Sequence, residues 1–79
     1  MSSILWENSY NKSMIGQKIK ELRIEFNLSQ EKLAKAINVH PSAVSLWESE
    51  KTEPKASYII SLSKFFNVSS DYLLGISDE

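Results

Sequence analysis

From residue 14 onward, the apolar positions recur every three or four residues, which is the spacing of one face of an α-helix. The stripe of the first predicted helix consists of Ile15, Ile19, Leu22 and Phe26. We expect Asn27 to end this helix. No part of the chain shows the strict alternation of apolar and polar residues that predicts a half-buried β-strand. The pattern therefore predicts an all-α fold.

Two short helices joined by a tight turn are predicted next. Ser29 is a favourable N-cap for the first of them, because its hydroxyl accepts a hydrogen bond from a free backbone N–H. Leu33 and Ile37 face inward, and the small Ala34 lies beside them. Asn38 tolerates the left-handed conformation that ends many helices, so the first short helix is expected to stop there.

The second short helix is predicted to begin at His40-Pro41, because proline is favoured at the first helical position. Val44 and Trp47 lie three residues apart and point toward the core. The outer side carries Ser42, Ser45 and Ser49, together with part of Leu46. A helix face that meets only solvent would favour Lys, Glu and Gln, which form helices better. Small hydroxyl side chains instead let a helix approach a nucleic-acid groove closely.

The remaining pattern adds two helices. A polar loop at residues 50–55 precedes a fourth helix, whose inner face carries Ile59, Leu62 and Phe66, flanked by Tyr58 and Phe65. A last short helix is expected over residues 71–74, capped by Ser69 or Ser70 and ended by Gly75. We therefore predict five helices in one domain over residues 14–76. Residues 1–13 are expected to form a loosely ordered arm with one apolar cluster, Ile4-Leu5-Trp6, and residues 77–79 a C-terminal tail.

Composition excludes several classes of protein. The 79 residues include no cysteine, so neither a disulfide framework nor a thiolate metal site is possible. No apolar run exceeds three residues, so we predict no membrane span and a cytoplasmic location. The net charge is −1, and residues 14–76 carry eight basic and seven acidic side chains. Strong long-range attraction to nucleic acid is therefore not expected, and the placement of charges must decide binding.

Residues 30–49 hold the pattern that points to function. Counting Gln30 as position 1, apolar residues fall at positions 4, 8, 10, 15 and 18, a small alanine at 5 and a turn-forming asparagine at 9. Two helices that cross at a wide angle need a small residue where they meet and a left-handed residue in the turn. The pattern is that of a helix-turn-helix, whose second helix fits the major groove of DNA.

The sequence resembles the Cro/CI-type (XRE) helix-turn-helix domain of phage repressors and bacterial transcriptional regulators. The matching segments, in order, are LSQEKLAKAINV, AVSLWE, a polar loop that reaches Pro54, and FFNVSSDYLLG. The resemblance covers the chain from Ile15 to Ile76. It implies a compact five-helix, lambda-repressor-like DNA-binding domain.

The resemblance also implies roles for individual residues. Gln30 corresponds to a residue that binds a DNA phosphate; a solvated position in a first helical turn is the alternative. The positions that meet bases and nearby backbone are His40, Pro41, Ser42, Ser45 and Leu46, and those of a phosphate-contacting loop are Ser49, Lys51 and Thr52. For His40, a surface position at the helix start is the alternative to a DNA contact. Arg23 and Glu48 correspond to an ion pair between the first and third helices.

Two residues depart from the family pattern. Asn38 replaces a glycine in the turn, which asparagine tolerates. Glu50 replaces a glycine after the recognition helix, where a carboxylate would face phosphate. Ser and His also stand where Gln, Arg or Asn would read bases more strongly. We therefore expect modest base specificity, with an important share from DNA shape.

These observations predict a sequence-specific transcriptional regulator, a repressor, that binds a near-palindromic operator in double-stranded DNA as a homodimer. We expect no cofactor, metal or catalytic site. The dimer surface is expected near Tyr72, Leu73 and Ile76, with the Ile4–Trp6 cluster as a second candidate. The alternative function is a protein-interaction module that binds a toxin, an anti-repressor or a larger regulator. The isoelectric point of about 5.8 motivates this alternative.

Overall fold

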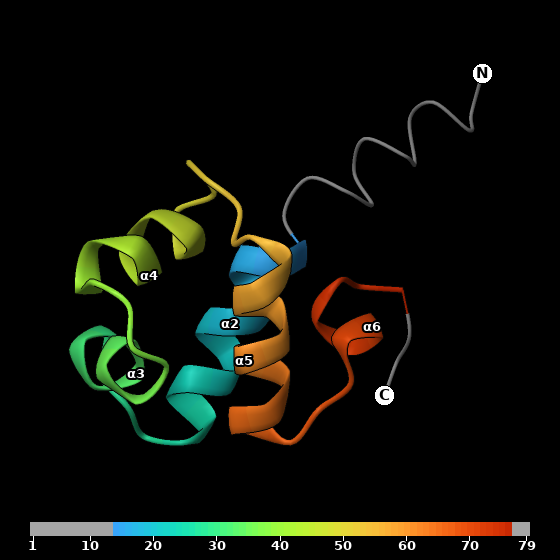
Figure 1. The fold of residues 1–79 in the computed structure, drawn as a ribbon, viewed down its shortest axis with the longest axis horizontal. Helices are drawn as coiled ribbons and strands as arrows, with labels where there is room; N and C mark the ends of the chain where they lie inside the picture. Colours follow the sequence, from blue (N-terminus) through green and yellow to red (C-terminus); the bar gives the residue numbers. More distant parts are fainter. Residues whose placement is uncertain (1–13, 77–79) are drawn as a thin grey trace.

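The computed structural model describes residues 14–76, which form five α-helices and no strand (Figure 1). The helices are α2 (Met14–Glu25), α3 (Gln30–Ala36), α4 (Pro41–Glu48), α5 (Ala56–Phe66) and α6 (Ser70–Leu73). α2 and α5 lie in the middle of the molecule, with α3 and α4 on one side and α6 on the other. The predicted all-α fold is confirmed. The expected arm (residues 1–13) and tail (residues 77–79) lie outside the described residues.

The core consists largely of the apolar positions that the helical periodicity predicts. The buried residues are Ile19, Leu22, Leu33, Ala34, Ile37, Val44, Trp47, Ile59, Leu62, Phe66 and Leu73. Phe26 departs from the prediction: α2 ends before it, and 45% of the residue is exposed. Its ring packs instead against Phe66, with the ring centroids 5.0 Å apart. Phe26 therefore covers one end of the core rather than filling it.

The expected dimer surface at Tyr72, Leu73 and Ile76 is wrong in part. Leu73 is fully buried, because α6 uses it to anchor its single turn to the core. Tyr72 is half-buried, and the ammonium of Lys18 lies 4.3 Å from the centroid of its ring. Of the three residues, Ile76 is the most exposed, at 62%.

Each of the five described helices is followed, one or two residues after its end, by a residue with a left-handed backbone. These residues are Asn27, Asn38, Glu50, Asn67 and Gly75. In each case the next backbone N–H donates to a carbonyl in the last helical turn, as Val39 N–H does to Ala34 O at 2.9 Å. Asparagine and glycine adopt this conformation readily, whereas glutamate does so at a cost. Glu50 is therefore the exception among the five helix ends.

Candidate nucleic-acid interface

α3, the turn through Asn38 and α4 form a helix-turn-helix with one buried and one exposed side. Val44 and Trp47 fix α4 to the core, with exposed fractions of 0% and 4%. The opposite side is exposed and carries Ser42, Ser45, Leu46 and Ser49. α4 therefore presents three hydroxyl side chains and one leucine to the outside, and the structure leaves this face uncovered by any described residue.

The first turn of α4 is organised by His40 and Pro41. His40 is the N-cap, and its Nδ1 accepts a hydrogen bond from Ser42 N–H at 3.1 Å. Since a backbone N–H only donates, Nδ1 carries no proton in this arrangement, and the ring proton lies on Nε2. Pro41 occupies the first helical position, where its missing N–H costs no hydrogen bond. His40 is exposed, so its Nε2–H is available to an outside acceptor.

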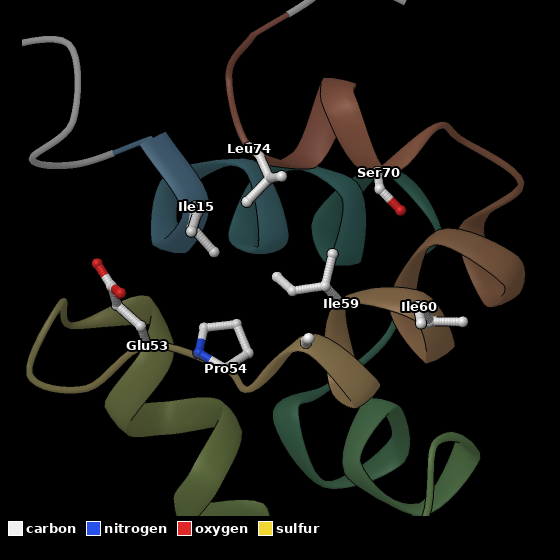
Figure 2. A pocket seen from close by; sticks show the side chains of 8 residues that line it. Ile15, Glu53, Pro54, Ile59, Ile60, Ser70 and Leu74 are labelled. Atoms are coloured by element: carbon white, nitrogen blue, oxygen red, sulfur yellow. The ribbon is translucent and has the colours of Figure 1, made fainter.

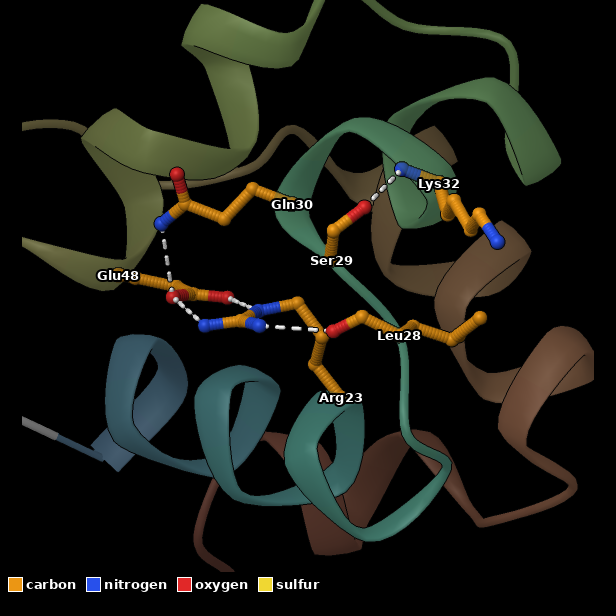
Figure 3. Close-up of polar contacts among 6 residues, drawn as sticks. All are labelled: Arg23, Leu28, Ser29, Gln30, Lys32 and Glu48. Atoms are coloured by element: carbon orange, nitrogen blue, oxygen red, sulfur yellow. Dashed lines mark hydrogen bonds and ion pairs between the residues drawn. The ribbon is translucent and has the colours of Figure 1, made fainter.

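A partly buried ion pair joins the end of α4 to α2 (Figure 3). Arg23 donates from Nε to Glu48 Oε2 at 2.6 Å and from Nη2 to Oε1 at 2.9 Å, and its Nη1 donates to Leu28 O at 2.8 Å. The side chains of Arg23 and Glu48 are only 13% and 5% exposed. The hydrogen bond to Glu48 raises the pKa of Arg23 against the opposing effect of burial, so the guanidinium stays charged.

Gln30, expected at a DNA phosphate, also contacts this pair. Its Nε2 donates to Glu48 Oε1 at 3.0 Å (Figure 3). An amide nitrogen carries two hydrogens, so this bond leaves a second donor for an outside acceptor. Gln30 is half-buried, and its amide links the start of α3 to the end of α4.

Three of the residues expected at the interface come together around a shallow hollow of about 270 Å³. We call it the α4 hollow; its lining residues are Lys20, Arg23, Gln30, Ser45, Glu48 and Ser49. Lys20 is exposed and brings a positive charge that the sequence analysis did not identify. The amide, hydroxyl and ammonium donors among these residues suit an anionic ligand such as a phosphate.

The loop after α4 uses its backbone donors within the chain. The N–H groups of Lys51 and Thr52 both donate to Leu46 O, at 3.0 and 3.4 Å, and Ser49 Oγ donates to the same carbonyl at 3.2 Å. A phosphate contact through these backbone amides would have to break existing bonds. The exposed side chains of Lys51 and Thr52 remain available for such a contact.

Gly16 positions α4 and was missed by the sequence analysis. A Cβ added at Gly16 would lie 2.2 Å from Trp47 O and 2.7 Å from Glu50 Oε2. The first turn of α2 therefore touches the backbone at the end of α4, and only glycine permits this approach. A glycine inside a helical pattern is the signal that could have indicated a close backbone contact.

Other chemistry is not indicated by the described part of the chain. Between residues 14 and 76, no group of three or more His, Asp or Glu side chains could hold a metal ion. Within the same range, none of the helices has the length and apolar character needed to cross a bilayer.

Comparison with known proteins places this geometry in a family. The model of the helix-turn-helix family matches residues 19–73. The chain is 43% identical over 58 residues to the HTH-type transcriptional activator BcrR of Enterococcus faecalis, covering 73% of this chain and 28% of that protein. It is 36% identical over 64 residues to repressor protein C2 of Salmonella phage P22, covering 81% of this chain and 30% of that protein. The chain thus spans less than a third of the length of either relative.

A solved structure matches the fold as well. It is the crystal structure of the P22 c2 repressor protein in complex with synthetic operator 9T, with a TM-score of 0.76 and 34% identity. The match covers 81% of this chain and 97% of that chain. The chain therefore belongs to the XRE-type helix-turn-helix family of transcriptional regulators.

Proposed function

We propose that this chain binds double-stranded DNA sequence-specifically and represses transcription. The observation that carries the proposal is the uncovered hydroxyl face of α4 beside the α4 hollow, where Gln30, Ser45 and Lys20 meet. The operator-bound P22 c2 repressor, with its similar fold, supports it. The regulator would act in the cytoplasm without a cofactor.

In this proposal, α4 is the recognition helix and enters the major groove. Ser42 and Ser45 hydrogen-bond base edges or nearby backbone, and Leu46, which is 39% exposed, contacts a thymine methyl group. The second N–H of Gln30 and the ammonium of Lys20 bind a phosphate at the α4 hollow. Lys51, Thr52 and Ser49 contact the backbone through their side chains. Arg23 and Glu48 hold α4 in place rather than touching DNA.

The same proposal includes a homodimer, because one helix with three reading side chains recognises few base pairs. We place the pairing surface at an apolar groove of about 390 Å³ between α2, α5 and α6 (Figure 2). Ile15, Pro54, Ile59 and Leu74 line this groove. Ile60 also lines it and is 51% exposed, so a second copy would cover apolar surface that water now contacts.

The first test is a selection of bound sequences from random double-stranded DNA, at about 100–150 mM salt so that electrostatic binding does not dominate. We expect a two-fold symmetric motif whose half-site spacing reports the geometry of the dimer. With about 3–5 phosphate contacts per subunit, the log–log slope of affinity against salt for the dimer should be shallower than about −10. Recovery of no motif above background would contradict the proposal.

Two variants then test the placement of the interface. Gln30→Ala and Ser45→Glu should abolish binding to the selected motif while leaving the unfolding transition in place. Lys64→Gln is the matched control for Ser45→Glu, because it also lowers the net charge by one at an exposed position near the end of α5. If both test variants bind as the parent does, α4 is not the recognition helix.

One observation favours the alternative of a protein-interaction module. Phe26 and Phe65 are 45% and 37% exposed, and their ring centroids lie 6.3 Å apart, beside the C-terminal ends of α2 and α5. An exposed aromatic pair is the kind of surface that partner proteins cover. If the selection recovers no DNA motif, partner capture with Phe65→Ser as the negative control becomes the decisive experiment.

A further inference from the structure

Glu50 combines an unfavourable backbone conformation with a charge that opposes DNA binding. Its φ is 66°, and the four equivalent helix ends in residues 14–76 use asparagine or glycine. Glutamate at such a position is destabilising, and a backbone cost of this kind is often retained for function. The side chain of Glu50 is therefore expected to have a function that offsets this cost.

The carboxylate of Glu50 is folded back over the first turn of α2. The evidence is the short distance of 2.7 Å between Glu50 Oε2 and the position of a Cβ on Gly16. Glu50 thereby joins a second hollow, of about 530 Å³, which we call the carboxylate hollow. Its lining residues are Gln17, Lys20, Glu21, Ile24, Glu48 and Glu50.

Lys20 and Glu48 line both the carboxylate hollow and the α4 hollow. The carboxylate of Glu48 is already neutralised by Arg23. Glu21 accepts a hydrogen bond from Gln17 at 3.1 Å. Because Gln17 is uncharged, this contact does not neutralise the carboxylate of Glu21. Glu50 and Glu21 therefore bring two carboxylates to the same hollow as Lys20, the cation that we assign to a DNA phosphate.

We propose that Glu50 is a negative determinant of DNA affinity, which lowers the attraction of Lys20 for phosphate and repels the phosphate directly. This inference rests on the proposed function. Glu50 thereby lowers the affinity of the regulator for DNA. A higher concentration of the dimer is then needed to occupy an operator.

Affinity measurements on Glu50→Gln test the inference, because glutamine keeps the size and the backbone cost but removes the charge. We expect binding to the selected operator to tighten about two- to fivefold at about 100 mM salt, with the gain shrinking as salt rises. In a Lys20→Met background the gain should be smaller. Glu25→Gln is the matched control: it removes the same charge from α2, at the end that faces Tyr72 rather than α4.

Three outcomes would overturn the inference. If the parent selects a motif and Glu50→Gln binds it with the same affinity, the inference fails and the proposed function stands. If Glu25→Gln tightens binding as much, only the net charge matters. If neither the parent nor Glu50→Gln binds any DNA, both the inference and the proposed function fail.

Discussion

Gly16→Ala tests how α2 is packed against α4. In an exposed helix this change is stabilising by about 1 kcal/mol, because alanine forms helices better. In this structure the new Cβ would lie 2.2 Å from Trp47 O, whereas real Cβ atoms stay at least 3.0 Å away, so the two backbones must separate by about 0.8 Å. Overpacking costs about 1–3 kcal/mol. We expect the upper part of this range, about 2–3 kcal/mol, because backbone atoms cannot rotate aside as side chains do.

We therefore expect Gly16→Ala to lower the free energy of unfolding by about 1–2 kcal/mol after the gain in helix propensity is included. For a domain of this size the midpoint of thermal unfolding should fall by roughly 4–16 °C. Thermal and urea unfolding, followed by circular dichroism, measure both quantities.

The double variant with Glu50→Ala identifies the atom responsible. If the carbonyl of Trp47 is the hard contact, removing the Glu50 side chain should restore less than about 0.5 kcal/mol of the loss. A Gly16→Ala protein that is as stable as the parent, or more stable, would refute the close approach of α2 to α4.

Three further substitutions probe the residues that hold α4. Arg23→Leu leaves the partly buried carboxylate of Glu48 without its charged partner and should cost about 3–5 kcal/mol in urea unfolding, a loss that Glu48→Leu in the same chain should largely reverse. The pKa of Arg23 is raised in the folded protein. Its contribution to the free energy of unfolding is therefore fully present below the ordinary pKa of arginine and is lost only as the pH rises through the pKa of the folded state. Arg23 should thus give unfolding no pH dependence near neutrality. His40→Ala removes the cap of α4 and should cost about 0.5–2 kcal/mol, whereas His40→Asn should retain most of the stability; equal losses in the two variants would argue against the cap. Ala34→Leu should cost at least about 1–3 kcal/mol by overpacking, and an unchanged unfolding midpoint would contradict the crossing of α3 and α4 at this residue.

The elements that depend on near neighbours could be predicted from the sequence. Ser29 accepts from Lys32 N–H at 3.1 Å, and Asn38 has a φ of 61°, because a cap and a turn are decided within three or four residues. Ser69, one of two alternatives, is the N-cap of α6 and accepts from Tyr72 N–H at 3.0 Å. The core positions of α5 follow for a similar reason, since 11 residues give a clear period.

The positions that the sequence did not reveal depend on contacts between distant segments. Leu73 was misplaced because α6 has four residues, which is too short for a period to separate its inner and outer sides. The amide bond of Gln30 to Glu48 spans 18 positions and has no local signal. Gly16 and Glu50 meet only because α2 passes the end of α4, and no pattern within either segment encodes that crossing.

If α4 reads DNA as proposed, these distant contacts couple the stability of the fold to that reading. The helix is held from three directions: by the core through Val44 and Trp47, by α2 through Gly16, and by Arg23 through Glu48. Base contacts require the hydroxyl groups of α4 to lie within a fraction of an ångström of their partners, whereas phosphate contacts by long side chains tolerate movement. Loosening any one of the three should therefore weaken binding to the operator more than binding to random DNA. The ratio of the two affinities, rather than the affinity alone, measures how firmly α4 is held.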